Sequence, residues 1–129
     1  TYIEAHIAYA RQLGRPIVLE EFGFDRDGGS YAPAATTAYR DRFYDMVFDR
    51  VEQSAADSGP LAGTNFWSWG GYGVAAHADY HWVNGDRGYT GDPPQEPQGL
   101  NSVFAGDAST MAVIADHATD LAEIATGTE

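Results

Sequence analysis

The stretch Arg15-Pro-Ile-Val-Leu-Glu-Glu-Phe-Gly23 decides the fold that the sequence predicts. Residues 16–19 suit a buried parallel strand, and two carboxylates follow them directly. Ionised side chains are too costly to bury unpaired in the middle of a strand, whereas at its carboxyl end they can face a solvent-filled cleft. α/β barrels and open α/β sheets hold their active sites at that end. The stretch therefore predicts a strand that delivers a carboxylate into an active site.

Helices and strands alternate on both sides of this stretch. Apolar periodicity and turn residues predict helices over 1–13, 35–56 and 109–125 and strands over 16–22 and 64–69. Residues 72–106 are irregular and rich in turn formers, and so long a loop in a compact domain is usually functional. The alternation predicts an α/β fold with parallel strands and helical crossovers.

The sequences of the last two predicted helices allow more specific expectations about their faces and ends. The helix over 35–56 is expected to turn an apolar face inward, made of Tyr39, Phe43, Met46, Val47 and Val51. Its charged residues are expected to form a solvated face, on which nearby arginines reduce the repulsion between the aspartates. These residues are Asp41, Asp45, Asp49, Arg40, Arg42 and Arg50. Asp107 or Ser109 is the expected N-cap of the last helix.

Two strands and three helices can neither close a barrel nor cover both faces of a sheet. A complete protein with this pattern would be a small open sheet or an obligate oligomer, whereas a piece of a larger barrel would be its last quarter to third. We favour the second interpretation. The chain begins with Thr1 rather than Met and carries no signal-peptide pattern, which fits a segment cut from something longer.

Composition excludes several classes of function. A net charge of −12 argues against nucleic acid as a partner, because phosphates require a basic surface. No apolar run approaches the roughly 20 residues that span a membrane, so no membrane segment is expected. The absence of cysteine excludes disulfides and thiolate chemistry. The hydrophobic content of 43% supports a globular protein.

Neighbouring carboxylates and aromatic side chains are the candidates for chemistry. On a regular strand Glu20 and Glu21 point to opposite faces, so they can enter one cleft together only if the strand bulges. They could also be solvated carboxylates on a loop beyond the strand. Trp67 and Trp69 would share a strand face, either in the core or as stacking surfaces for sugar rings. Asn65 lies on the same face.

The loop over 72–106 adds further polar and aromatic candidates. His77, Asp79 and His81 have a spacing that could suit metal ligation, but no third carboxylate is arranged nearby. No metal site is therefore expected, and loop hydrogen bonds or substrate contacts are preferred. Tyr72 and Trp82 would suit additional sugar subsites. No phosphate-cradling loop or nucleotide-binding motif is present, and no cofactor is expected.

These motifs together resemble a known enzyme family. Pro16-Ile-Val-Leu-Glu-Glu-Phe-Gly23 resembles the seventh barrel strand of glycoside hydrolase family 5, whose nucleophile is the glutamate directly before the aromatic–glycine pair. Gly63-Thr-Asn-Phe-Trp-Ser-Trp69 resembles the eighth strand, whose tryptophan stacks on the sugar at the cleavage point. Gly91-Asp-Pro-Pro-Gln-Glu-Pro-Gln-Gly-Leu-Asn-Ser-Val-Phe104 is similar to the long loop before the last helix of the family's β-mannanases.

The resemblance implies that residues 1–129 are the C-terminal portion of a (β/α)8 catalytic barrel, with strands seven and eight and their flanking helices. It makes Glu21 the catalytic nucleophile and Trp67 the stacking surface. It leaves a further set as candidate sugar contacts: Trp69, Tyr72, His77 and Trp82. If β-strand alternation holds, Leu19 and Glu21 share the face at the barrel mouth and Glu20 turns outward.

The activity implied is retaining, endo-acting hydrolysis of β-1,4-mannan, through two carboxylates roughly 5–5.5 Å apart. In this family the acid/base glutamate comes from strand four, so this chain needs upstream barrel strands and is expected to be inactive alone. Polymeric mannan from plants lies outside cells, which implies a secreted enzyme. Two alternatives stay open: a cellulase-like glycanase of the same family, and a non-catalytic polysaccharide-binding fragment.

Overall fold

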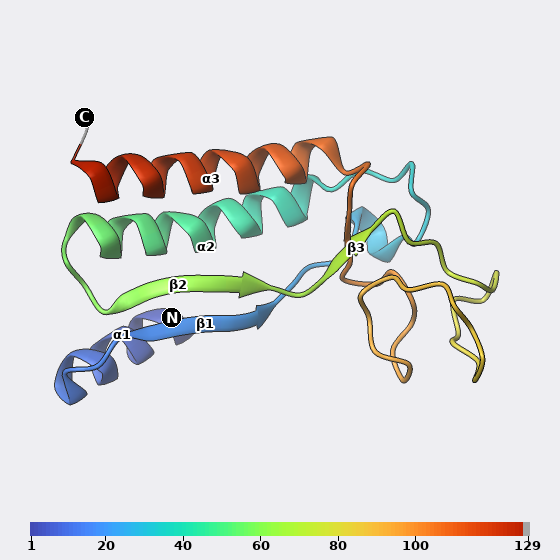
Figure 1. The fold of residues 1–129 in the computed structure, drawn as a ribbon, viewed down its shortest axis with the longest axis horizontal. Coiled ribbons are helices and arrows are strands. Elements are labelled where there is room, and N and C mark those ends of the chain that lie inside the picture. The colour runs from blue at the N-terminus through green and yellow to red at the C-terminus, as the bar shows by residue number, and fades with distance from the viewer. Residues whose placement is uncertain (128–129) are drawn as a thin grey trace.

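The computed structural model describes residues 1–127 as a mixed α/β arrangement (Figure 1). Its main helices are α1 (Tyr2–Leu13), α2 (Ala38–Ala56) and α3 (Ala108–Thr126), with a short 3-10 helix η1 (Asp27–Gly29). Its strands are β1 (Ile17–Phe22), β2 (Leu61–Phe66), β3 (Trp69–Gly71) and β4 (Val103–Phe104). Within these residues no helix is both long and apolar enough to cross a membrane.

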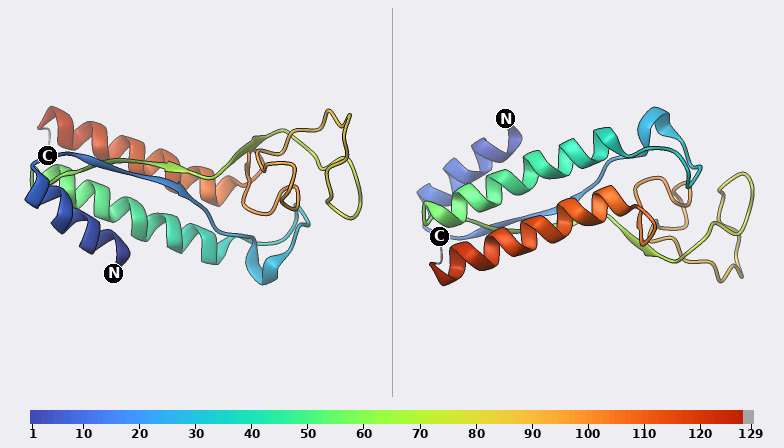
Figure 2. Two further views of the ribbon diagram at one scale, coloured as in Figure 1. Left: turned by 90° about the horizontal axis from the view of Figure 1, so that it is seen from below. Right: turned by 90° about the horizontal axis from the view of Figure 1, so that it is seen from above.

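The strands form two parallel pairs, β1 with β2 and β3 with β4. Helices α2 and α3 pack side by side along β2, and α1 lies beside β1 (Figures 1 and 2). The irregular segments gather beyond the carboxyl ends of β1 and β2 (Figure 1). The prediction of alternating helices and parallel strands is therefore confirmed, while β3 and β4 were not expected as separate strands.

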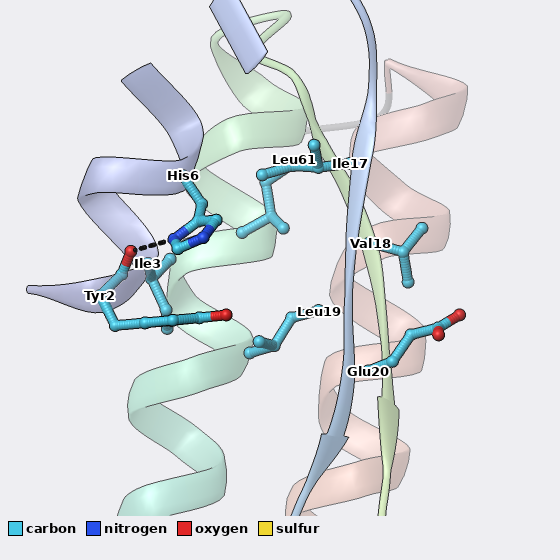
Figure 3. Close-up of a pocket in the computed structure, with 8 residues that line it drawn as sticks. All are labelled: Tyr2, Ile3, His6, Ile17, Val18, Leu19, Glu20 and Leu61. Carbon is cyan, nitrogen blue, oxygen red and sulfur yellow. Dashed lines mark hydrogen bonds between the residues drawn. The ribbon is translucent and has the colours of Figure 1, made fainter. Parts of the chain in front are cut away.

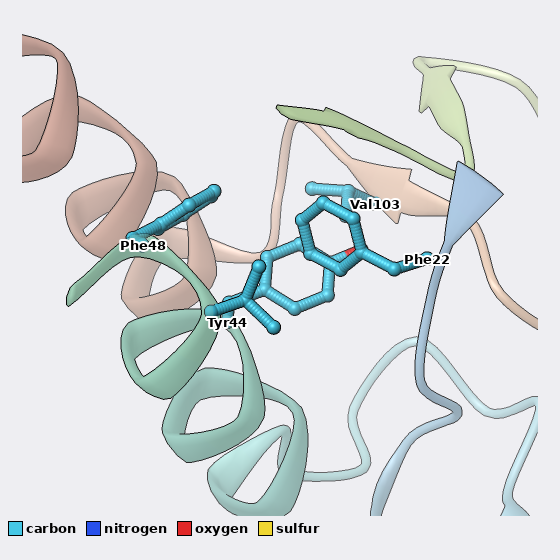
Figure 4. Packing of buried hydrophobic residues seen from close by; sticks show 5 residues of the cluster. Phe22, Tyr44, Phe48 and Val103 are labelled. Atoms are coloured by element: carbon cyan, nitrogen blue, oxygen red, sulfur yellow. The ribbon is translucent and has the colours of Figure 1, made fainter. Parts of the chain in front are cut away.

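Aromatic side chains from β1 and α2 form the centre of the core. Phe22, Tyr44 and Phe48 meet edge to face, with ring centroids 5.1 to 6.0 Å apart, and Val103 packs beside them (Figure 4). Such edge-to-face pairs add to the free energy gained from burying apolar area. Because Phe22 directly follows the two glutamates, this cluster fixes the end of β1.

The inward face of α2 differs from the expected one. Met46 is 47% exposed and Tyr39 is 59% exposed, although Val47 and Val51 are buried as expected. The buried face carries polar groups as well as apolar ones: Arg40, Tyr44, Val47, Phe48, Val51 and Ser54. The expectation failed because it counted only apolar residues, and a paired arginine can also face inward.

The second strand begins and ends three residues before the expected range of 64–69. Leu61 is only 2% exposed and packs with Ile7 and Val51, which anchors the start of β2 directly after Pro60. The aromatic residues that suggested a later strand lie beyond its end. Trp69 instead opens β3.

Asp27, in the segment after β1, caps the N-terminus of α2 although it lies 11 residues before Ala38 in the sequence. The Asp27 carboxylate accepts hydrogen bonds from the backbone N–H of Ala38 at 3.0 Å and of Tyr39 at 2.9 Å, and from the Thr36 hydroxyl at 2.6 Å. These bonds, led by the Thr36 hydroxyl, lower the pKa of Asp27 below its usual value. The start of α2 is thus tied to the segment that follows the two glutamates.

A buried ionic cluster joins three separate segments, and it corrects the expectation that Arg40 belongs to a solvated face. Arg40 is 0% exposed and Arg26 is 2% exposed, and both donate to the carboxylate of Asp107. Asp107 is the N-cap residue of α3, as one of the two expected candidates. Its carboxylate makes no cap hydrogen bond within α3, because it binds the arginines and the N–H of Phe104 instead.

The long loop is held by buried polar groups rather than by an apolar core. Thr90 donates to the amide oxygen of Gln98 at 2.9 Å, and the Gln98 amide nitrogen donates to Pro93 O at 3.0 Å. Asp92 accepts from Gly99 N at 2.5 Å and from the Ser102 hydroxyl at 2.8 Å. This network explains how a segment with few regular elements is ordered.

Tyr44 provides a test of the core. Burial raises its pKa to about 12, and its hydroxyl has no hydrogen-bond partner among residues 1–127. Its neutral form is therefore favoured in the folded state. The unfolded chain ionises this tyrosine near pH 10, before the folded chain does. The free energy of unfolding should therefore fall as the pH rises from about 10 towards 12, by a few kcal/mol at most.

We expect Tyr44→Phe to be neutral or stabilising at pH 7, because it removes an unpaired buried hydroxyl. Above pH 10 the variant should retain stability that the natural chain loses. Urea unfolding at pH 7 and at pH 10.5 to 11.5 measures both effects. If the free energy of unfolding depends equally on pH in the two proteins, the raised pKa of Tyr44 is contradicted.

Candidate active site

The carboxyl end of β1 carries a β-bulge at Glu21. In the parallel register Glu20 lies opposite Asn65 and Phe22 lies opposite Phe66, so Glu21 is the additional residue. Its φ is 56°, in the left-handed region that residues other than glycine seldom adopt. Bulges of this kind often re-aim a side chain next to an active site.

The bulge overturns the alternation expected for this strand. Leu19 and Phe22 both pack into the core, whereas the intervening Glu20 and Glu21 are both exposed. The expectation that Leu19 and Glu21 share a face is wrong, because the extra residue shifts the phase of the strand. Both carboxylates can enter one cleft only if the strand bulges, and the structure has that bulge, with Glu20 and Glu21 between two core-facing residues.

The face of the β1–β2 pair that carries Glu20 is not covered by the helices. Val18 and Glu20 lie on the side of β1 opposite to Leu19, and Val18 is 49% exposed (Figure 3). A side chain built at Gly63, opposite Val18, would meet no atom within 4 Å. A pocket of about 300 Å³ also opens between α1 and β1, with His6 and Glu20 among its lining residues (Figure 3).

Trp67 is held against the end of β1. Its backbone N–H donates to Phe22 O at 2.7 Å, and the following peptide bond, Trp67–Ser68, is cis. Gly23 lies so close that a Cβ there would come within 2.4 Å of Trp67 O. The structure therefore brings Trp67 next to the segment that contains Glu21, and its side chain is half-buried.

Trp69 occupies a different strand from the one expected. It begins β3, is 52% exposed and pairs in register with Val103. The expectation that Trp67 and Trp69 lie on one face of one strand is wrong, because β2 ends at Phe66, Trp67 lies in the connection after it and Trp69 begins β3.

Two of the other candidates meet in a second pocket. Tyr72 and His77 line a cavity of about 470 Å³, which Tyr31 and Tyr80 also line. The rings of Tyr31 and Tyr80 stack with centroids 4.3 Å apart. Trp82 is half-buried and does not line this pocket, and neither do Glu21 and the other tryptophans.

His77 is engaged by an acidic neighbour in the same loop. Its Nε2 lies 3.0 Å from both carboxylate oxygens of Asp86. The hydrogen bond from Val83 N–H, followed by that from His77, lowers the pKa of Asp86. Asp79 accepts from His81 N–H. Across residues 1–127 no three His, Cys, Asp or Glu side chains converge in a way that could hold a metal ion.

Comparison with known proteins assigns the chain to a family. Residues 1–126 match the family described as GH family 5 beta-mannosidase-like, so the chain is a glycoside hydrolase family 5 member of the mannosidase type. The predicted resemblance to family 5 is thereby confirmed.

Individual relatives are distant but consistent in kind. The chain is 28% identical over 82 residues to mannan endo-1,4-beta-mannosidase 4 of Solanum lycopersicum, covering 64% of this chain and 20% of that protein. It is 36% identical over 67 residues to mannan endo-1,4-beta-mannosidase 3 of Arabidopsis thaliana, covering 51% of this chain and 15% of that protein.

A solved structure matches nearly the whole chain. The family 5 mannosidase from Rhizomucor miehei, in a mutant form, superimposes with a TM-score of 0.85 at 30% identity, over 98% of this chain and 31% of that one. Another structure of that protein is described as a complex with mannosyl-fructose. The chain thus spans about a third of the solved relative's length and about a fifth or less of the plant relatives.

The sequence reasoning missed the residues that support these side chains. Gly23 was noted only as part of a motif, and its need for close approach to Trp67 depends on a contact 44 positions away. Asn101 O accepts from Ser68 N–H at 3.3 Å, and Ser68 O accepts from Val103 N–H at 2.8 Å. The only sequence signal for these contacts was the joint presence of the three motifs.

A paired substitution tests the close approach at Gly23. Gly23→Ala would place a methyl group against Trp67 O, and we expect a loss of about 1–3 kcal/mol in the free energy of unfolding. Gly63→Ala is the matched control, since its methyl group would meet open space. It should be neutral or slightly stabilising. Denaturant unfolding checks both, and equal losses in the two variants would contradict the close approach.

Proposed function

We propose that this chain supplies the nucleophile half of the active site of a retaining endo-β-1,4-mannanase. The proposal rests on one observation: Glu21 and Trp67 come from the ends of neighbouring parallel strands that a hydrogen bond from Trp67 N–H to Phe22 O holds together. The family membership adds that the chemistry is glycoside hydrolysis of the mannosidase type.

In the proposed reaction Glu21 attacks the anomeric carbon, and the glycosidic C–O bond breaks. A second carboxylic acid protonates the departing oxygen, which leaves a covalent glycosyl ester on Glu21. The same second group then takes a proton from water, which attacks the anomeric carbon and releases Glu21 as a carboxylate. Trp67 stacks on the sugar at the cleavage point, and a further set of residues contacts flanking sugars: Trp69, Tyr72, His77 and Trp82.

The second carboxylate is proposed to come from upstream barrel strands, with β1 and β2 as strands seven and eight of a (β/α)8 barrel. The uncovered face that carries Val18 and Glu20 supports this arrangement, because parallel strands such as β1 and β2 occur almost only in sheets with both faces covered. Glu20 is an unsuitable acid/base, since it reaches the cleft from the same strand as Glu21. The two groups of a retaining pair approach the sugar from different sides.

The substrate is proposed to be β-mannan or a related plant polysaccharide, encountered outside the cell. The plant relatives are described as mannan endo-1,4-beta-mannosidases, and the fungal relative as a mannosidase. A cellulase-like specificity is the alternative within the family. Release of reducing sugar from galactomannan, compared with release from a soluble cellulose, distinguishes the two.

Substitution of Glu21 tests the role of the nucleophile. A hybrid barrel, in which this chain replaces the matched third of the Rhizomucor miehei mannosidase, provides the upstream strands. In it we expect Glu21→Gln to reduce the release of reducing sugar from galactomannan by roughly a thousandfold or more, because no covalent intermediate can form. Glu20→Gln is the neighbouring control and should keep activity within a few fold. Retained turnover in Glu21→Gln would refute the proposal.

The 129-residue chain alone provides a second test. With its intact mass confirmed, it should release no reducing sugar from galactomannan, because it has a nucleophile without an acid. Measured activity would mean that an acid/base lies in the loop over 72–106 or in a second copy of the chain. If the fragment only binds polysaccharide, manno-oligosaccharides should change its tryptophan fluorescence equally in the natural chain and in Glu21→Gln.

A further inference from the structure

Arg40 connects α2 to three segments that are distant from it in the sequence. Its Nε donates to Phe24 O at 2.7 Å, and its Nη1 donates to Ser102 O at 3.0 Å and to the Asp107 carboxylate at 3.2 Å. The side chain is completely buried. One guanidinium group therefore binds the segment after β1, the segment before β4 and the start of α3.

These contacts lie close to the two residues that the proposed function uses. Phe24 is three residues beyond Glu21, and Gly23 between them faces both Trp67 O and the Asn101 side chain. Ser102 follows Asn101, whose carbonyl accepts from Ser68 N–H, next to Trp67. Arg40 therefore binds carbonyls close to two backbone contacts. Phe24 lies two residues from Phe22, which accepts from Trp67 N–H, and Ser102 lies next to Asn101, which accepts from Ser68 N–H.

Asp107 fixes where the guanidinium lies. Its carboxylate binds Arg40 through one oxygen and Arg26 through the other, and the Arg26 guanidinium also lies 5.3 Å from the centroid of the Phe104 ring. Burial and then the charge of Arg26 lower the pKa of Arg40 below its usual value. The Arg40 guanidinium has little freedom to move, because it and Arg26 are buried cations that share the Asp107 carboxylate and would lose an acceptor by moving.

We infer that Arg40, held by Asp107, is a positioning residue that sets the location of Glu21 relative to Trp67 through the carbonyl groups of Phe24 and Ser102. This inference rests on the proposed function of Glu21. The planar guanidinium is required, since two of its nitrogens donate in fixed directions to different segments. A lysine ammonium keeps the charge but cannot reproduce that fork.

Hydrogen exchange of the 129-residue chain tests the geometry without any activity. In Arg40→Lys we expect the amides of Trp67, Ser68 and Val103 to exchange about tenfold faster or more, through local opening of the strand ends. The amide of Ile17, which donates to Pro60 O at the opposite end of the sheet, should be unaffected. Unchanged exchange, or an equal increase at all these amides, would overturn the inference.

Kinetics in the hybrid barrel test the consequence for catalysis. At a temperature where each variant is fully folded, Arg40→Lys should reduce kcat about 10- to 100-fold, because small displacements of a reacting group are costly. KM for galactomannan should change less than threefold. Asp107→Asn, which keeps the side-chain shape, should act in the same direction. Arg50→Lys is the matched control on the same helix, since Arg50 is exposed and its polar side-chain contacts within residues 1–127 are only to the exposed side chains of Glu4 at 3.7 Å and Gln53 at 3.3 Å.

The outcomes separate the two proposals. If Glu21→Gln abolishes turnover but Arg40→Lys keeps its kcat, Glu21 is the nucleophile and the positioning role of Arg40 is wrong. If Glu21→Gln keeps turnover, the proposed function is wrong, and hydrogen exchange alone decides whether Arg40 holds the strand ends together. A lower unfolding temperature with unchanged kcat would assign Arg40 a purely structural role.

Discussion

The buried carboxylate of Asp107 is the constraint on which the arrangement of the strand ends depends. Two buried arginines must find acceptors, and removing one partner of such a group leaves an uncompensated charge at high cost. The acceptors come from segments far apart in the chain: Phe24 O, Ser102 O and the N-cap of α3. The apolar core positions β1 and α2, and the ionic cluster then determines how the irregular segments meet beyond them.

The elements that could be predicted from sequence are those whose signals are local. Apolar periodicity with Gly14 at its end gives α1, and a short apolar run before Glu20 gives β1. The inward position of Arg40 could not be predicted, because its partner Asp107 lies 67 residues away and the helix itself offers nearby aspartates as alternatives. The bulge at Glu21 likewise depends on register with β2, which no local pattern encodes.

The long loop shows a different limit. Its polar residues gave a correct expectation of irregular structure, yet not of how the loop is held. Thr90, Asp92, Gln98 and Ser102 are buried and bind one another, although each type is usually exposed. The tyrosines that line the pocket with Tyr72 and His77 come partly from the segment after β1, so the sequence could nominate Tyr72 and His77 but not their neighbours.

The bulge also bears on which glutamate can act. On a regular strand one carboxylate would face the helices and the other the open side, and chain position alone would leave the assignment uncertain. The extra residue leaves both carboxylates exposed, so exposure does not distinguish them. What distinguishes them is attachment: Glu20 stays in register opposite Asn65, whereas Glu21 lies where the chain turns towards Gly23 and Trp67. Under the proposed function, a carboxylate next to the backbone contact between Phe22 O and Trp67 N–H is better placed for attack on a sugar stacked on Trp67 than one that continues the strand.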